Sequence, residues 1–314
     1  MIWLSWRQQR TEALLVAALL AALAAVLVPN GLHMANVYDE LHLSSCVVDH
    51  PRSCMEAISS FNAQFDGLSG VFVWFNFIPG LIGVLLAAPF VLDLEHGTYR
   101  LAWTQSVTRR RWLTVKVATA VVCALAATGA ATAVVGWWRG PLDHLNGRFD
   151  VGVFDFEGVV PYAYTLFALG LTLAIGAVTR RIVPSILAGL VGYSVVRIFV
   201  QDWLRRRFEQ PLSATWPANV RGVNLQRAWV LAERPTDRFG HTMPDVGRVM
   251  RACAPGAPNP ASFDCLTGHG LYRHAVWQPA GRFWLFQGIE FAIFASLAVA
   301  LIGLAVVWVR RRTV

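Results

Sequence analysis

The first candidate for chemistry in this sequence is its only lysine, because a phosphate-binding loop requires one. The chain contains 27 Lys and Arg residues, and only Lys116 among them is a lysine. A P-loop places its lysine directly after a glycine-rich turn, whereas residues 113–117 around Lys116 contain no glycine. The chain therefore carries no Walker A site for ATP.

Two common hydrolytic motifs are also absent from the sequence. The sequence contains neither a Gly-x-Ser-x-Gly elbow nor a His-Glu-x-x-His pair, so two common hydrolytic arrangements are missing. Scattered acids between residues 201 and 283 offer carboxylates to a membrane enzyme acting on lipid-linked substrates: Asp202, Glu209, Asp237, Asp245 and Asp264. Their spacing follows no catalytic motif, which favours solvated loop charge.

The five cysteines divide between an apolar block and two polar segments. Cys123 lies in the apolar block and is expected to be a small buried hydrophobe. The other four are Cys46, Cys54, Cys253 and Cys265. Disulfides between Cys46 and Cys54 and between Cys253 and Cys265 would each close a short loop, although four cysteines allow three pairings. A zinc site that adds His241 and His269 matches no common finger spacing.

Composition places these residues in a membrane protein. Of 314 residues, 55% are hydrophobic and 15% are charged, against about a quarter charged in soluble domains. The apolar blocks are long enough to form spanning helices: Ala13–Val28, Leu68–Leu92, Val117–Trp138, Val159–Val178, Ile182–Val200 and Trp284–Val309. We predict an all-α membrane protein with six transmembrane helices in one domain, residues 1–314.

Basic residues in short loops predict how the chain is oriented. They lie between blocks two and three, between blocks four and five, and after block six: Arg100, Arg109, Arg110, Arg111 and Lys116; Arg180 and Arg181; Arg310, Arg311 and Arg312. The positive-inside rule then puts both termini in the cytoplasm and segments 29–67 and 201–283 outside. The same positions explain the net charge of +8 by lipid headgroups rather than by nucleic acid.

Residues 1–12 form an expected interfacial segment, because they alternate apolar with polar and basic side chains. A cleaved signal peptide is the alternative, since Arg7 and Arg10 resemble a basic leader, but no clean cleavage site follows. Block one is expected to end at Pro29-Asn30.

Blocks four and five are separated only by residues 179–181 and must form a tight helical hairpin. Their glycines, at positions 170, 176, 189 and 192, favour close helix packing.

Two features suggest a substrate pathway or gate. Block two carries Trp74, Phe75 and Phe77 before Pro79-Gly80, a combination that suits an apolar wall and a kink, or equally packing and lipid contact. Arg197 and Glu290 are ionisable residues inside apolar blocks, where an unpaired charge is costly. We predict an Arg197–Glu290 pair near the outer surface; separate snorkelling of each side chain is the alternative.

The segment between blocks two and three, residues 93–116, is predicted to be a short amphipathic helix on the inner surface. Thr98 is placed to cap its start, and Tyr99, Leu101 and Trp103 to enter the interface. Thr108 is placed to cap the next helix. The alternative interpretation, without a functional role, is a solvated basic loop that only follows the positive-inside rule.

This segment carries a family resemblance. Its order of Glu-x-Gly-Thr, then Ser-x-Thr-Arg, then a lysine opening a span resembles permease subunits of type-2 ATP-binding-cassette exporters. The residues that match are Glu95, Gly97, Thr98, Ser106, Thr108, Arg109 and Lys116. The six-span layout is similar too, while the long segment before block six departs from the family.

The resemblance implies that residues 95–109, including Arg100, dock on a separate ATPase subunit, which would bind the ATP and Mg. It also implies two ATPase copies, a second permease chain in a homodimer, a bacterial plasma membrane location, and outward transport of an apolar or amphipathic substrate. No cofactor or metal is expected in this chain. The alternatives from other classes are the lipid-linked enzyme and a membrane scaffold without turnover.

Overall fold

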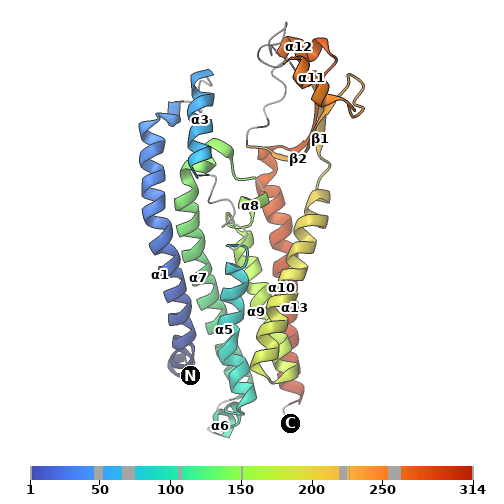
Figure 1. The fold of residues 1–314 in the computed structure, drawn as a ribbon. Coiled ribbons are helices and arrows are strands. Elements are labelled where there is room, and N and C mark those ends of the chain that lie inside the picture. Colours follow the sequence, from blue (N-terminus) through green and yellow to red (C-terminus); the bar gives the residue numbers. More distant parts are fainter. Residues whose placement is uncertain are drawn as a thin grey trace. The chain divides into compact units, whose positions relative to one another are not determined.

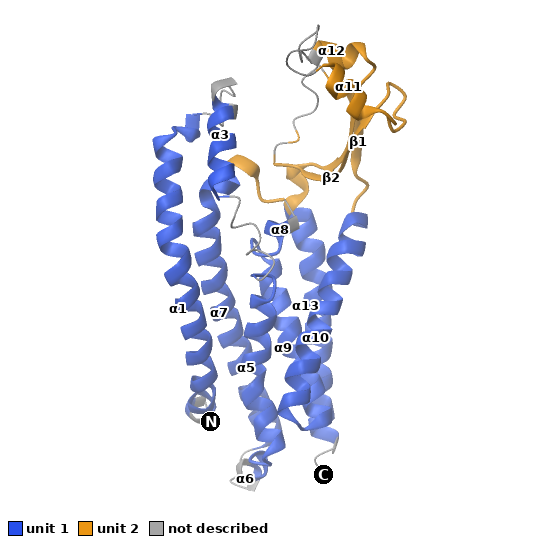
Figure 2. Ribbon diagram, viewed as in Figure 1, with its two compact units in different colours: residues 1–144, 152–208, 284–314 blue, residues 145–151, 209–283 orange. Residues whose placement is uncertain are grey.

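The computed structural model describes residues 2–45, 52–65, 75–104, 108–149, 151–218, 225, 227–253 and 263–312. These residues form two compact units, coloured separately in Figure 2. Unit 1 comprises residues 1–144, 152–208 and 284–314, and unit 2 comprises residues 145–151 and 209–283. The candidate sites that carry the functional argument lie in unit 1.

Unit 1 is a bundle of long helices (Figure 1). Its main members are α1 (Ile2–Glu40), α5 (Ile78–Glu95), α7 (Arg109–Asn146), α9 (Val160–Thr179), α10 (Ile182–Phe199) and α13 (Phe283–Arg312), with shorter α3 (Arg52–Phe65), α6 (Tyr99–Thr104) and α8 (Val151–Phe154). Across the described residues, six helices are long and apolar enough to cross a membrane. The six predicted blocks therefore correspond to six helices.

The centre of unit 1 is formed by α5 and α9. Buried residues make up 72% of the most apolar window of α5 and 67% of that of α9, against 11% for α1. Glycine permits this packing, because a Cβ at Gly176 would lie 2.3 Å from Val91, and one at Gly189 would lie 2.3 Å from Thr172. The predicted packing role of these two glycines is confirmed.

The first helix differs from the prediction at both ends. Residues 2–12 are continuous with α1 and form no separate short helix, while their place at the membrane interface stays a prediction. Pro29 lies inside the helix, which continues to Glu40. The predicted end at Pro29-Asn30 is wrong. In apolar surroundings, breaking a helix exposes many unsatisfied backbone groups, whereas an internal proline removes one bond. Asn30 instead accepts a hydrogen bond from the Trp138 indole at 2.8 Å.

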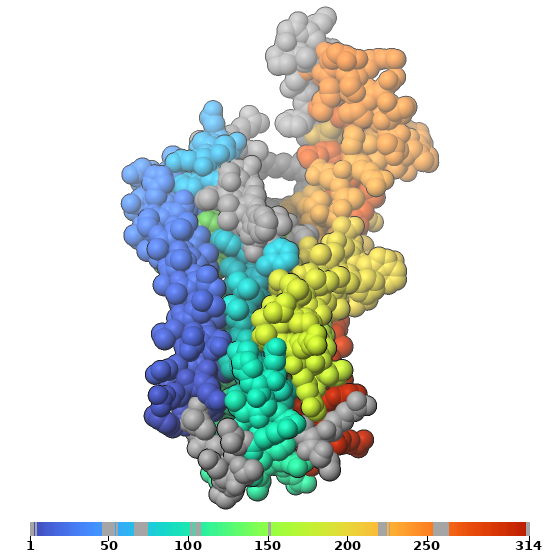
Figure 3. All heavy atoms as spheres, turned by 60° about the horizontal axis from the view of Figure 1, so that its bottom comes forward, coloured from blue at the N-terminus to red at the C-terminus, as the bar shows by residue number. Residues whose placement is uncertain are grey.

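Two further turns bound the helices of unit 1. Pro79 stands in the first turn of α5, where proline is well tolerated. Block two before Phe75 lies outside the described residues, so the kink at Pro79-Gly80 stays a prediction. The hairpin between α9 and α10 is confirmed: Arg180 closes α9 in a left-handed conformation, and Thr179 and Ser185 hydroxyls lie 3.1 Å apart. In Figure 3, α10 (yellow-green) lies beside α5 (cyan), where the Tyr193 ring covers Gly80.

Unit 2 contains a sheet, which corrects the all-α prediction. Strands β1 (Leu212–Pro217), β3 (Tyr272–Gln278) and β2 (Trp229–Thr236) pair antiparallel in that order. Helices α11 (Val246–Ala252) and α12 (Phe263–Gly268) complete the unit. Residues 201–207, predicted to belong to this segment, instead continue α10 as a π-helical turn and a 3-10 turn.

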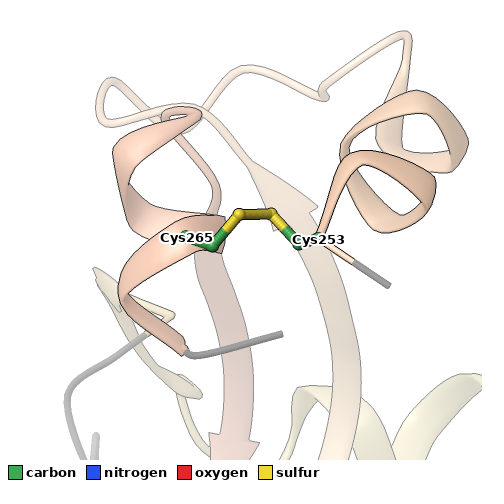
Figure 4. The surroundings of a disulfide bond; sticks show 2 residues. All are labelled: Cys253 and Cys265. Atoms are coloured by element: carbon green, nitrogen blue, oxygen red, sulfur yellow. A yellow bond between two sulfur atoms is a disulfide. The ribbon is translucent and has the colours of Figure 1, made fainter. Parts of the chain in front are cut away.

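The predicted Cys253–Cys265 disulfide is present in unit 2 (Figure 4). It joins the residue after α11 to α12 across a Cα–Cα distance of 5.9 Å. His269 has a ring nitrogen near both sulfurs, but disulfide sulfurs are not thiolate ligands, so the zinc alternative fails here. Cys54 is disulfide-bonded, while Cys46 lies outside the described residues. Cys123 is a half-buried free thiol.

Candidate functional site

The turn after α5 explains the glycine of the Glu-x-Gly-Thr motif. Gly97 has a φ of 70°, a left-handed conformation that a side chain disfavours. A Cβ there would meet no atom within 4 Å, so backbone conformation rather than space requires glycine. The turn ends α5 and lets α6 begin two residues later.

Two motif residues tie this turn to neighbouring helices. The Glu95 carboxylate accepts a hydrogen bond from the Ile182 N–H at 2.7 Å. Glu95 therefore caps α10, and its negative charge faces the positive end of that helix. The Thr108 hydroxyl accepts from the Arg111 N–H at 3.4 Å, which confirms its predicted capping of α7.

Thr98 takes a different partner from the one predicted. Its hydroxyl donates to the Asp93 carboxylate at 2.9 Å instead of capping α6. Asp93 also pairs with Lys116 of α7 at 2.5 Å, and Lys116 donates to Gln8 of α1, again at 2.5 Å. This clasp of buried Asp93 and Lys116 with exposed Gln8 joins α1, α5 and α7 beneath the turn. It gives the motif lysine a structural role that sequence spacing did not show.

The remaining residues of the segment divide between surface and interior. Arg100 and Arg109 are exposed, and the Arg109 guanidinium lies 4.6 Å from the centre of the Trp103 ring. Tyr99 is buried and contacts Trp103 and Trp112, so it packs against protein and does not enter the membrane interface as predicted. Ser106 and the side chain of Leu101 lie outside the part of the chain that the structure describes.

A second polar site lies inside the bundle. The predicted direct pair of Arg197 and Glu290 is replaced by two separate pairs: Arg197 binds Asp155 at 2.7 Å, and Arg205 binds Glu290 at 2.7 Å. Arg205 also pairs with Asp155. These four side chains, with the phenol of Tyr164, form a charge cluster. Its Arg and carboxylate charges balance, which is the condition for keeping such groups out of water.

Hydrogen bonds make the charge cluster continuous. Arg205 donates to both Glu290 oxygens, from Nε at 2.7 Å and from Nη2 at 2.8 Å, a bidentate arrangement. The Tyr164 hydroxyl lies within hydrogen-bond distance of Glu290 and at 2.8 Å from Asp155. Arg197 donates to Asn76 at 2.6 Å. The cluster thus connects α9, α10 and α13.

The Asp155 carboxyl lies in the loop between α8 and α9. Complete burial raises its pKa, but attraction to Arg205 and then to Arg197 outweighs burial and lowers the pKa below its usual value. Beside it, Gln287 of α13 accepts from the N–H groups of Val159 and Val160, both at 3.0 Å. That amide satisfies the first free donors of α9 and fixes the loop.

Asp155 and Arg205 are the functional candidates that sequence reasoning missed. Asp155 had a signal, because it and Glu157 are the two acids in the otherwise apolar run 151–160. Arg205 had none, since it stands among other arginines beyond the predicted end of block five.

Two of the three predicted pathway aromatics, Phe75 and Phe77, lie within the described residues. Phe75 is buried and packs edge-on against Trp138 and Phe156. Phe77 is 37% exposed, and Trp74 lies outside the described residues. A pathway role for these aromatics stays a prediction.

The scattered acids of the enzyme alternative do not assemble a metal-type cluster among the described residues. Asp237 is bonded to His241, Asp245 to Arg248, and Glu209 lies 3.9 Å from Arg282. Asp202 is exposed. These contacts match solvated surface charge.

Comparison with known families decides between the interpretations. Residues 17–205 match the family described as ABC-2 membrane transporter related. The chain belongs to this family. The match runs from residue 17 within α1 to Arg205, and so includes the turn after α5 and all of the charge cluster except Glu290. No curated protein and no solved structure matches the chain.

Membership of the ABC-2 family and six apolar helices make this chain a multi-pass membrane protein. Its role is that of a membrane subunit of an ABC transporter. The family match ends before unit 2, apart from residues 145–151, so the sheet and its disulfide are features that this family description does not cover.

Proposed function

We propose that this chain is the permease of an ATP-driven exporter in a bacterial plasma membrane. Two copies would form the pathway, and two copies of a separate ATPase subunit would bind ATP and Mg and drive transport of an apolar or amphipathic substrate. The observation that carries the proposal is the turn after α5. It combines exposed cations with a rigid base, as a docking surface requires.

The rigid base comes from contacts on both sides of the turn. Glu95 holds the start of α10, and the clasp of Asp93, Lys116 and Gln8 holds α1 and α7. Movement of the turn would therefore reach three helices directly. Arg100 and Arg109 remain exposed for a partner.

In Figure 1, α6 lies at the same end of unit 1 as the start of α1 and the end of α13, which supports placing all three in the cytoplasm.

The exposed apolar helices support a larger assembly in the membrane. The apolar windows of α1, α10 and α13 are only 11%, 22% and 22% buried. Lipid and a second permease chain would cover these faces.

The test is affinity purification from membranes. We expect an ATPase to co-purify with the wild-type chain and to be lost from the Arg100→Glu, Arg109→Glu double variant. Arg311→Glu is the matched control, because Arg311 is exposed on the last turn of α13. Glu95 is left unchanged, since its loss would also uncap α10. Equal recovery of ATPase with wild type and double variant would reject the docking site, and no ATPase with any form would favour the scaffold.

A further inference from the structure

The α10 helix changes its winding at one place. It is α-helical from Ile182 to Phe199, π-helical from Val200 to Leu204, and 3-10 helical from Arg205 to Arg207. The Arg205 N–H bonds the Val200 carbonyl, five residues back. A π-helical turn is rare and is frequently found at functional sites.

The π turn explains how two arginines reach one cluster. In a regular α-helix, residues eight apart lie about 80° from the same face, whereas residues seven apart lie about 20° from it. A π turn holds one extra residue, so Arg197 and Arg205 align as though they were seven apart. Both are buried in the charge cluster.

The alternative register has a defined consequence. If residues 200–204 became α-helical, Leu204 would take the angular place of Arg205, and Arg205 would rotate by about 100°. Glu290 would then lose its bidentate partner, while Asp155 would keep Arg197. The carboxylates of the cluster thus favour the π register, while backbone geometry favours the α register.

We propose that this π turn is a register switch in α10 that releases Arg205 from Glu290 and Asp155 during the transport cycle. The link to the proposed function is the Glu95 cap: a docked ATPase that displaces the turn after α5 also displaces the start of α10. The α10 helix conveys that displacement to its other end, where the π turn absorbs it and the charge cluster opens.

The variant that tests the switch is deletion of Asp202. Asp202 is exposed within the π turn. Its deletion leaves Arg197 and Arg205 seven positions apart, so a regular α-helix satisfies the cluster and no switch remains. Asp202→Ala is the matched control, because it removes the same side chain and keeps the extra residue.

The measurement is backbone hydrogen exchange of the detergent-solubilised full chain. In wild type and Asp202→Ala, the amides of residues 200–206 should exchange at least ten times faster than those of the preceding α10 turns. The deletion should slow them at least tenfold. Equal rates in wild type and deletion would overturn the proposal. A deletion variant that fails to fold would also overturn it, because a regular α-helix with the two arginines seven positions apart should keep both ion pairs.

A second measurement separates the switch from the proposed function. In a purified complex with the ATPase, we expect the deletion to keep the ATPase bound and to lower ATP turnover at least fivefold. Wild-type turnover would overturn the role of the switch in the cycle. If no ATPase binds even to wild type, the proposed function fails, and hydrogen exchange alone decides whether the switch exists.

Discussion

Neutralising Glu290 should destabilise the protein more than any substitution of a surface acid. The Glu290 carboxylate is fully buried and receives two hydrogen bonds from Arg205, at 2.7 and 2.8 Å. Removing one partner of a buried ion pair costs about 3–5 kcal/mol, because the other charge stays in low dielectric. At about 2 °C per kcal/mol for a chain of this size, Glu290→Met should melt roughly 6–10 °C below wild type.

The refuting result comes from the double variant Arg205→Met, Glu290→Met. It removes one charge of each sign and leaves Arg197 paired with Asp155, and replacing a whole buried pair by apolar groups is often nearly neutral. We expect its melting temperature to lie at or above that of either single variant. If the two single losses simply add, Arg205 and Glu290 do not act as a pair. Glu56→Gln, on the exposed surface of α3, is the control and should change stability by less than about 0.5 kcal/mol.

Three other predictions concern packing, the disulfide and pH. Gly176→Ala forces a Cβ to within 2.3 Å of Val91, so thermal melting should show a loss of about 1–3 kcal/mol, while Gly303→Ala, which faces open space, should melt as wild type. Cys253→Ser with Cys265→Ser opens a loop with a sequence separation of 12; limited proteolysis of the full chain should cut unit 2 faster, consistent with a loss of about 3 kcal/mol. Because the folded pKa of Asp155 is lowered, its contribution is present above about pH 4 and is lost as the pH falls further; Asp155→Asn should flatten that part of the melting-temperature profile against pH.

Hydrophobic block length predicted the six helices because a spanning helix needs a long run of apolar residues, which the sequence displays directly. Their ends were less predictable. Pro29 was treated as a boundary, yet α1 continues to Glu40. The sheet of unit 2 was missed because β1 and β2 contain Pro217 and Pro235, which count against a strand, and because their residues show no clean alternation of burial.

The residues of the candidate sites were likewise only partly predictable from the sequence. Gly97 and Thr108 were found because turns and caps demand particular residue types, which a motif preserves. The partners of Arg197 and Glu290 were not found, because Asp155 reaches Arg197 from a loop and Arg205 reaches Glu290 only through a π turn. Periodicity assumes uniform winding, so a change of register within a helix cannot be read from residue spacing.

The most direct test of the account is photo-crosslinking in native membranes, with a photoreactive amino acid placed at Arg100 in one variant and at Arg311 in another. We expect the Arg100 position to capture a protein with a Walker A motif and the Arg311 position not to do so. Capture of no such protein from Arg100, in a chain that is folded and inserted, would contradict the claim that the turn after α5 is where an ATPase drives this permease.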